Sequence, residues 1–162
     1  MLSPTLPLPH SPTRPLASKM AHFQPNPDAY PLRRGTAAVV LRGDRFLVIR
    51  RSQSVLAPGE YCFPGGGIEG LETEPEALIR ELREELAVEI RPLHKVWHNL
   101  TRWNVDLAWW LAEMDTDAPL VANLDEVESI HWMTAAEMLA LDKLLESNRH
   151  FLEAVAAGEI SL

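Results

Sequence analysis

Residues 64–88, with the sequence PGGGIEGLETEPEALIRELREELAV, decide the fold expected for this chain. Three consecutive glycines at 65–67 tolerate backbone angles that other residues avoid, so we expect a turn with exposed peptide groups there. Thr73 is placed to open a helix, because Pro75 fits only into the first turn of one. Residues 76–86 have a strongly helix-forming composition. The segment is therefore predicted to be a glycine turn that leads into a helix.

This predicted helix has an apolar face and an acidic face. The apolar face carries aliphatic side chains at positions i, i+1, i+4 and i+8: Leu78, Ile79, Leu82 and Leu86. The acidic face carries Glu81, Glu84 and Glu85 at i, i+3 and i+4, a spacing at which like charges repel. Oxygen ligands at helix spacing suit a hard divalent cation such as Mg2+ or Mn2+. The acidic face therefore indicates a metal site.

The same stretch resembles the signature of the Nudix hydrolase family, G-x5-E-x7-R-E-U-x-E-E-x-G-U, in which U is bulky and apolar. The spacing is kept throughout, and the matching residues are Gly66, Glu72, Arg80, Glu81, Leu82, Glu84, Glu85, Ala87 and Val88. Fixed positions separated by long fixed spacers make a specific signal. The plainer alternative, a solvated acidic helix after a glycine turn, does not require this spacing.

Two positions depart from the family pattern. Ala87 stands where the signature has Gly, and Leu71 stands where the family has Gly before the first signature Glu. Neither change removes a ligand or a charge. Ala87 therefore bears only on how the chain turns out of the helix.

The resemblance implies roles for the acidic residues. Glu84 and Glu85 are expected to be the principal ligands of Mg2+ or Mn2+, and Glu81 a further ligand or the general base. The backbone carbonyl of Gly65 is expected to supply another ligand oxygen.

The resemblance also implies residues that support catalysis. Arg80 is expected to hold Glu72 or Glu81 in position by charge-assisted hydrogen bonds, and Gly66 and Glu72 to support the site structurally. In the family, the chain ahead of a Trp such as Trp132 often supplies another carboxylate. Glu126 is therefore a candidate for an extra ligand or the general base, as is Glu128; a solvated acidic loop is the alternative.

Four further residues are candidates for substrate binding. Arg50 and Arg51 end a predicted strand, where they either meet a phosphate or base or carry ordinary surface charge. Trp103, like Trp97, is a candidate for base stacking. In some family members a residue near the position of Asn148 recognises the base. A simpler explanation is that Asn148 caps the start of a helix.

The remaining pattern predicts an ordered series of elements. Strands are expected at about 36–42, 45–51, 61–63, 93–102, 105–113 and 129–133, and helices at about 73–86, 134–144 and 147–157. Pro92 is expected to interrupt the chain before the fourth strand. Trp109 and Trp110, which lie in an apolar run, are expected in the core. The order predicts an α/β protein, and the resemblance implies a Nudix-type α/β/α sandwich with a mixed sheet.

The ends of the chain differ in composition. Eight of the thirteen prolines lie between Pro4 and Pro31, so residues 1–32 are interpreted as a Pro-rich flexible tail and residues 33–162 as a Nudix hydrolase domain. The tail has no continuous apolar run, so we expect no signal peptide.

Charge and cysteine content limit the partners. A net charge of −8 argues against nucleic acid, and no apolar run is long enough for a membrane span. The single cysteine, Cys62, excludes an internal disulfide and fits a reducing, cytoplasmic compartment; we expect it to be a buried, inert thiol. A small nucleotide is the expected substrate, and a homodimer is possible.

Taken with the resemblance, these features predict Mg2+-dependent hydrolysis of a phosphoanhydride bond in a nucleoside diphosphate linked to another moiety. The substrate class stays open between nucleoside triphosphates, nucleotide sugars and similar compounds. Two alternatives are a sensor that binds nucleotides without cleaving them and an enzyme that cleaves RNA caps. All four signature glutamates are present, which favours catalysis, and the acidic chain disfavours RNA.

Overall fold

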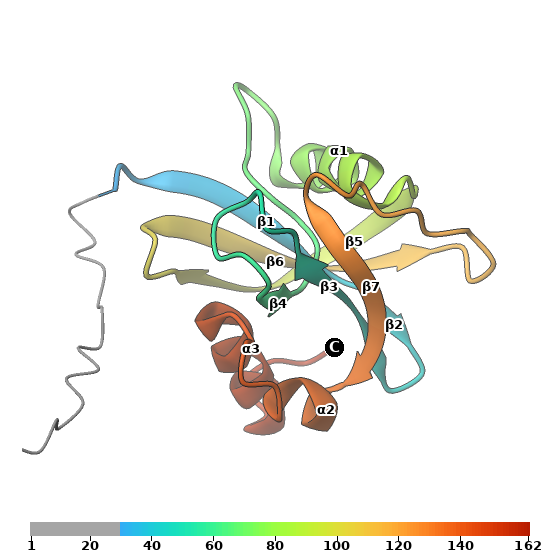
Figure 1. The fold of residues 1–162 in the computed structure, drawn as a ribbon. Helices are drawn as coiled ribbons and strands as arrows, with labels where there is room; N and C mark the ends of the chain where they lie inside the picture. The colour runs from blue at the N-terminus through green and yellow to red at the C-terminus, as the bar shows by residue number, and fades with distance from the viewer. Residues whose placement is uncertain (1–29) are drawn as a thin grey trace, which may run out of the picture.

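The computed structural model describes residues 30–162, in which one helix separates two groups of strands and two further helices end the chain (Figure 1). The elements are β1 Arg33–Val39, β2 Leu41–Arg42, β3 Arg45–Arg51, β4 Tyr61–Cys62, α1 Glu74–Leu86, β5 Ile90–Leu100, β6 Val105–Met114, β7 Val127–Thr134, α2 Ala135–Leu139 and α3 Glu146–Ala156. The tail predicted for residues 1–32 falls almost entirely outside the described part. Its last residues are in contact with the domain, since the Tyr30 carbonyl accepts a hydrogen bond of 2.8 Å from Asn104 Nδ2.

The strands form two sheets. In the first, of order β1-β6-β5, β6 runs parallel to β1 and antiparallel to β5, so this sheet is mixed as predicted. In the second, β3 pairs antiparallel with β2, β4 and β7. A turn at Gly43-Asp44 joins β2 to β3, between the strands predicted at 36–42 and 45–51, with Gly43 at a φ of 60°.

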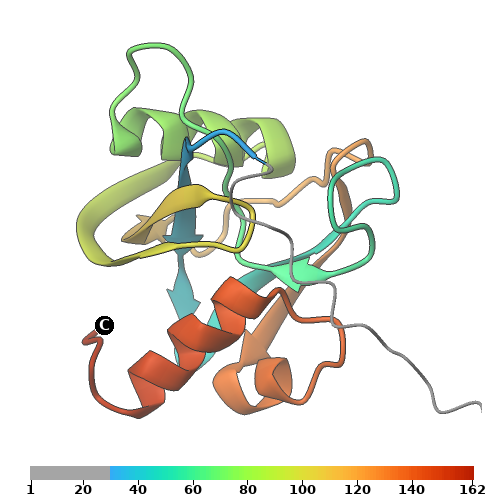
Figure 2. The same ribbon diagram turned by 90° about the vertical axis from the view of Figure 1, so that its left-hand side faces the viewer.

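Helices cover the strands from both sides. α1 lies on one side and α2 and α3 lie on the other (Figures 1 and 2). A core under α1 contains Leu78, Leu82 and Leu86, and a second core beside α3 contains Trp109 and Phe151, whose rings stack at 4.4 Å. The α/β/α sandwich is therefore confirmed. No helix within residues 30–162 is long and apolar enough to cross a membrane.

α1 begins and packs as the sequence predicts. Thr73 and Glu76 form a capping box, in which the Thr73 side chain accepts from the Glu76 N–H and the Glu76 carboxylate accepts from the Thr73 N–H. Pro75 lies in the first turn, where its missing N–H is not needed. These local signals fix where the helix starts and hence which face its glutamates occupy.

β5 differs from the prediction because Pro92 does not interrupt it. The strand begins at Ile90, passes through Pro92, and shifts register between Pro92 and His94. β5 pairs only with β6 in the sheet order, so Pro92 lies on an edge strand, where a missing N–H is tolerated.

The helix predicted for residues 134–144 is shorter than expected. Thr134 and Glu137 form the predicted capping box, but α2 ends at Leu139. The Arg149 guanidinium of α3 donates to the carbonyls of Leu139 (2.9 Å) and Leu141 (3.0 Å). This tertiary contact stabilises the carbonyls where the helix stops.

α1 ends at Ala87, which has a left-handed φ of 53°. Gly is favoured at such a position because a Cβ costs about 1–2 kcal/mol there. The turn that follows a signature helix is thus retained without the signature glycine.

Replacing Ala87 with Gly should relieve this strain and raise the free energy of unfolding by up to about 1 kcal/mol, since the gain is offset by the greater entropy of Gly in the unfolded chain. Thermal melting would show a rise of a few degrees. Ala157→Gly is the matched control, because Ala157 ends α3 at a φ of −76° and carries no such strain. An Ala87→Gly protein no more stable than Ala157→Gly would contradict the expectation.

Candidate active site

The glycine loop is held against β1 by backbone hydrogen bonds. The carbonyls of Pro64 and Gly66 accept from the N–H groups of Ala38 and Thr36, each at 2.8 Å. Gly65 has a φ of 141°, and a Cβ there would lie 2.2 Å from the Thr36 carbonyl oxygen. Only glycine permits this approach, so the loop sequence fixes where the loop lies.

Three carboxylates converge beside this loop. Glu81 and Glu85 come from α1, and Glu126 comes from the segment before β7; an oxygen of each lies within 4.8 Å of the others. The segment that carries Glu126 is tied down by the Asn123 N–H, which donates to the Glu85 carbonyl (2.8 Å), and by the Ser52 N–H, which donates to the Glu126 carbonyl (2.9 Å). The site thus combines residues from α1, the end of β3 and the approach to β7.

Two of these carboxylates are buried. Glu85 is only 4% exposed, and burial raises its pKa to about 8, although the Gly65 N–H donates to it at 2.9 Å and opposes that shift. Burial also raises the pKa of Glu81, and its hydrogen bond with Arg80 acts in the opposite direction. Crowded, buried carboxylates resist full ionisation unless a cation joins them.

Arg80 is the centre of a charge network on the outer side of this cluster. Its guanidinium donates to both Glu72 oxygens, at 2.7 and 3.0 Å, and to Glu81 at 3.0 Å. It also donates to the Gly67 carbonyl at 2.8 Å. Hydrogen bonds with Arg80 are the main reason that the pKa of Glu72 is lowered. Arg80 thus contacts both glutamates suggested by the resemblance and joins the glycine loop to α1.

Glu84 lies apart from the three converging carboxylates. Its side chain is half exposed and accepts from Arg80 at 3.1 Å. The structure therefore places Glu126, rather than Glu84, in the cluster with Glu81 and Glu85. Glu128 is also apart from the cluster, because it pairs with Arg50 at 3.1 Å.

A cavity of about 160 Å3 lies next to the glycine loop. Its walls include Thr36 and Ala37 of β1, the two residues against which Gly65 packs. Aromatic side chains and polar groups complete it, among them Arg51, Phe63, Trp103 and Asn148. Three of the four substrate-binding candidates, Arg51, Trp103 and Asn148, therefore line one cavity.

The other candidates lie elsewhere. Arg50 pairs with Glu128, donates to the Gly59 carbonyl at 3.2 Å, and is not among the residues that line the cavity. Trp97 packs against Trp109 and Phe151. Trp109 is fully buried, as predicted, and Cys62 is buried with its pKa raised by burial to about 11, as expected for an inert thiol.

The capping role favoured for Asn148 is wrong. α3 has Leu145 as its N-cap residue and no side-chain capping bond. Asn148 is buried instead, and its Oδ1 accepts from the Phe63 N–H at 2.7 Å while its Nδ2 donates to Ser147 Oγ at 3.2 Å. It connects α3 to the residue that precedes the glycine loop, a contact across 85 residues that no local pattern reveals.

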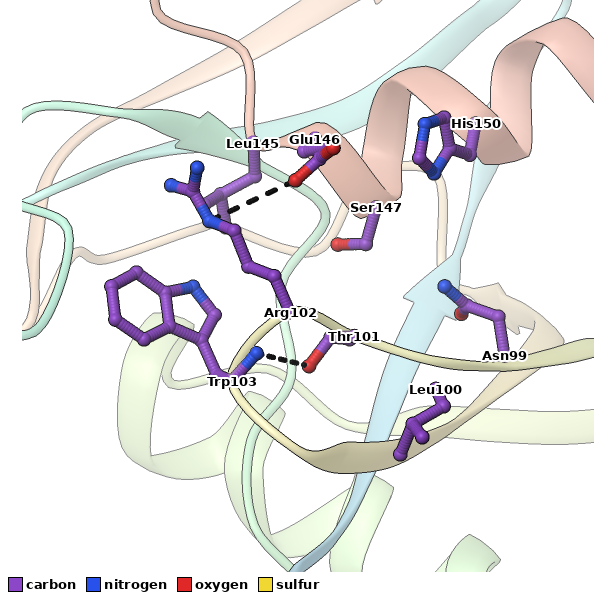
Figure 3. A pocket seen from close by; sticks show the side chains of 9 residues that line it. All are labelled: Asn99, Leu100, Thr101, Arg102, Trp103, Leu145, Glu146, Ser147 and His150. Atoms are coloured by element: carbon purple, nitrogen blue, oxygen red, sulfur yellow. Dashed lines mark hydrogen bonds and ion pairs between the residues drawn. The ribbon is translucent and has the colours of Figure 1, made fainter. Parts of the chain in front are cut away.

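A second cavity, of about 210 Å3, lies between the β5–β6 turn and the start of α3 (Figure 3). Arg102 extends beside Trp103 toward Glu146, with a closest ion-pair distance of 3.9 Å. Thr101, Trp103, Leu145 and Ser147 line both cavities, which are therefore neighbours. Sequence reasoning missed this cavity because its two sides come from distant segments.

The residues of the cluster suit a divalent metal. All three side chains are carboxylates, which hard cations prefer, and among the described residues this is the one group with such a geometry. Gly66 also leaves room for one of them, since a Cβ at this position would lie 2.4 Å from the Glu81 carboxylate. Because Glu81 and Glu85 are buried, the cluster differs from a solvated acidic face, and its oxygens could hold a metal ion.

Comparisons with known proteins match the chain to one family. The sequence model of the NUDIX domain matches residues 31–155. The NAD-capped RNA hydrolase NudC of Pseudomonas entomophila is 25% identical over 124 residues, which are 76% of this chain and 44% of that protein. The CTP pyrophosphohydrolase of Escherichia coli is 40% identical over 53 residues, 33% of this chain and 39% of that protein. The chain thus spans less than half the length of these relatives.

Solved structures share the fold. A MutT protein from Methanosarcina mazei superposes with a TM-score of 0.66 at 20% identity, covering 80% of this chain and 96% of that one. A UDP-X diphosphatase superposes with a TM-score of 0.62 at 14% identity, covering 80% of this chain and 64% of that one. At these identities the likeness concerns the fold alone.

Replacing Gly66 with Ala should displace the Glu81 carboxylate and weaken Mn2+ binding about 10- to 100-fold, as expected when the positioning of a ligand is lost. Isothermal titration with Mn2+ would measure this change. Gly67→Ala is the matched control, because nothing lies within 4 Å of a Cβ at that position. Equal affinities in the two variants would show that the position of Glu81 does not matter for the metal.

The raised pKa of Glu85 predicts a pH dependence of stability in the presence of chelator. Between pH 4.5 and about 8, folded Glu85 retains a proton that the unfolded chain releases, so the stability of the metal-free protein should fall as pH rises through this window. Glu85→Gln should not show this loss. The melting temperature of the variant minus that of the wild type should therefore increase from pH 5 to pH 8. A constant difference across the window would contradict the assignment.

Proposed function

Because the chain belongs to the Nudix family, as the match over residues 31–155 shows, we propose that it hydrolyses a phosphoanhydride bond in a nucleoside diphosphate linked to another moiety. The observation that carries the proposal is the convergence of Glu81, Glu85 and Glu126 beside the glycine loop and next to a cavity. The proposal concerns this chain of 162 residues, which matches only part of the length of the curated relatives.

The metal of this site is proposed to be Mg2+, with Mn2+ able to replace it. Glu81, Glu85 and Glu126 would hold it, with Glu84 and the Gly65 carbonyl as further ligands. When bound, the ion offsets the charge of the phosphate oxygens and lowers the pKa of a bound water. Without such a cation, an acidic cluster in a chain of net charge −8 would repel an anionic substrate.

The protein's own side chains would position the catalytic carboxylates and accept a proton. Arg80 holds Glu72 and Glu81 through charge-assisted hydrogen bonds, so it fixes the loop and the cluster relative to each other. The general base is proposed to be Glu81 or Glu126. Glu81 has a pKa raised by burial, which makes it a better proton acceptor than an ordinary carboxylate, and its contact with Arg80 limits that rise.

The cavity beside the cluster is proposed to receive the nucleoside part of the substrate. Phe63 and Trp103 supply aromatic surface for a planar base, and the charge of Arg51 lies close enough to affect Glu85. The named relatives act on NAD-capped RNA and CTP, so their names do not select one substrate. The acidic chain favours a small nucleotide over RNA. A cytoplasmic location and a homodimer remain predictions from the sequence.

The purified protein should release phosphate-containing products from at least one member of a panel of nucleoside triphosphates, nucleotide sugars and dinucleotides. Activity should require Mg2+ or Mn2+ and be abolished by EDTA. Glu85→Gln should lower kcat by about two to three orders of magnitude with the fold retained, because it removes a charged ligand. Chromatography of the products measures the rates.

Glu89→Gln is the control for this experiment. Glu89 follows α1, is exposed, and pairs with Arg83 rather than with the cluster, so its replacement should leave the rate unchanged. A Glu85→Gln protein with the wild-type rate would sink the ligand assignment. Tight nucleotide binding without metal-dependent cleavage would instead identify a sensor.

A further inference from the structure

Asn123 lies in the segment that carries Glu126 into the carboxylate cluster, and its side chain contacts that carboxylate. Its Nδ2 donates to Glu126 Oε1 at 3.3 Å, and its Oδ1 accepts from the Asp125 N–H at 3.3 Å. Together these bonds fix the orientation of the amide, because a reversed amide would set an oxygen against the carboxylate and an NH2 group against an N–H. The Asn123 amide is therefore a donor aimed at one member of the cluster.

The backbone of Asn123 contacts a second member of the cluster. Its N–H donates at 2.8 Å to the carbonyl of Glu85, which belongs to the last turn of α1, where carbonyls lack partners within the helix. Its own carbonyl accepts from the N–H groups of Glu126 (2.9 Å) and Val127 (2.7 Å). Asn123 thus joins the end of α1 to the start of β7 and links Glu85 to Glu126.

The backbone turn does not by itself require an asparagine. The turn uses a side-chain acceptor for the Asp125 N–H, which aspartate supplies equally well and serine or threonine more weakly. Ser52, the other anchor of this segment, bonds to backbone groups, since its Oγ donates to the Asp125 carbonyl at 2.6 Å and accepts from the Ser54 N–H at 3.3 Å. Asn123 differs because its amide donates to the Glu126 carboxylate itself.

A carboxylate that lies beside two others needs such a donor to stay in place. Glu126 is partly exposed and has an oxygen within 4.8 Å of the other two cluster carboxylates, so repulsion favours turning it away from them. The other two members each have a donor of their own, one in the guanidinium of Arg80 and one in the N–H of Gly65. The Asn123 amide is the corresponding donor for Glu126.

We propose that Asn123 is a positioning residue of the metal site: its side-chain amide holds the Glu126 carboxylate toward Glu81 and Glu85, so that the three can bind one divalent cation. The inference rests on the metal site of the proposed function, and it gives a role to a residue outside the signature. Hydrogen bonds that orient a metal ligand from outside contribute about 10- to 100-fold to metal affinity.

The test compares Mn2+ binding by the wild type and by Asn123→Ser, measured from the free-Mn2+ signal in electron paramagnetic resonance, which also detects weak binding. Serine keeps an acceptor for the Asp125 N–H but is too short to place a donor where the amide nitrogen lies. The affinity for Mn2+ should therefore fall about tenfold. The backbone bonds of residue 123 do not involve its side chain, so the variant should fold. Asn123→Thr is the second variant if melting curves show that Asn123→Ser is unfolded.

A double-mutant comparison shows whether the amide acts through Glu126. In a Glu126→Ala background, Asn123→Ser should change the Mn2+ affinity by less than about twofold, because the group that the amide holds is gone. Asp115→Ser is the matched control. Asp115 makes the same kind of turn bond, to the Asp117 N–H at 3.0 Å, but is not a member of the cluster, so its replacement should leave Mn2+ affinity unchanged.

Each remaining outcome also decides the matter. Wild-type Mn2+ affinity in Asn123→Ser overturns the inference and leaves the proposed function intact. A full tenfold loss in the Glu126→Ala background, or an equal loss in Asp115→Ser, shows that the amide does not act by orienting Glu126, with the same consequence. A wild-type protein that binds Mn2+ but cleaves nothing in the panel overturns the proposed hydrolysis alone. A wild-type protein that binds no Mn2+ overturns both conclusions.

Discussion

Repulsion among three converging carboxylates is the constraint on which the site depends. Arg80 offsets part of it, and its guanidinium is shared among Glu72, Glu81 and Glu84. Glu85 is buried and receives its hydrogen bond from the neutral Gly65 N–H instead; burial raises its pKa to about 8, and this hydrogen bond only partly opposes the rise. The fold thus balances the outer side of the cluster with a fixed cation, and on the proposed function a bound metal ion would balance the inner side. An arrangement of this kind couples metal affinity to pH, since a metal must displace protons that burial has stabilised.

β1 brings this cluster together with the proposed substrate cavity. One edge of the strand bonds to the glycine loop and the other pairs with β6, so β1 is held on both sides. The close approach at Gly65 places the peptide that binds Glu85 directly beside Thr36 and Ala37, which line the cavity. Glycine is required at this position because of the space between two backbones, not for flexibility. A chain with a side chain at 65 would have to move the loop, and with it the contact to Glu85.

The sequence predicts those parts of the structure that are encoded locally. The capping box of α1, its apolar face and the position of its glutamates all follow from residues within two turns of one another. The Gly43-Asp44 turn is equally local. Contacts between distant segments decide the rest: Arg149 ends α2, and Asn148 reaches back to Phe63. Pro92 shows the same limit, because whether proline is tolerated in a strand depends on whether that strand lies at an edge. The family resemblance could nominate Glu126 but could not show that Asn123 and Ser52 hold its segment beside Glu85.

Unfavourable features of the structure fall into two groups, which differ in what could relieve them. Buried Glu85 adjoins the glycine loop, and a cation bound at the cluster would remove the cost of burying its charge. The left-handed Ala87 caps the C-terminal end of α1, two residues after Glu85, and its N–H is satisfied by helix carbonyls. No ligand at the cluster would relieve that strain, since it resides in the backbone angle of a residue that is exposed. Strain that a ligand can relieve is a reason to infer function, whereas strain that it cannot relieve is a feature of the backbone alone. By this criterion the departure from the signature at Ala87 is neutral for chemistry, whereas the buried carboxylate of Glu85 is a reason to infer a bound cation.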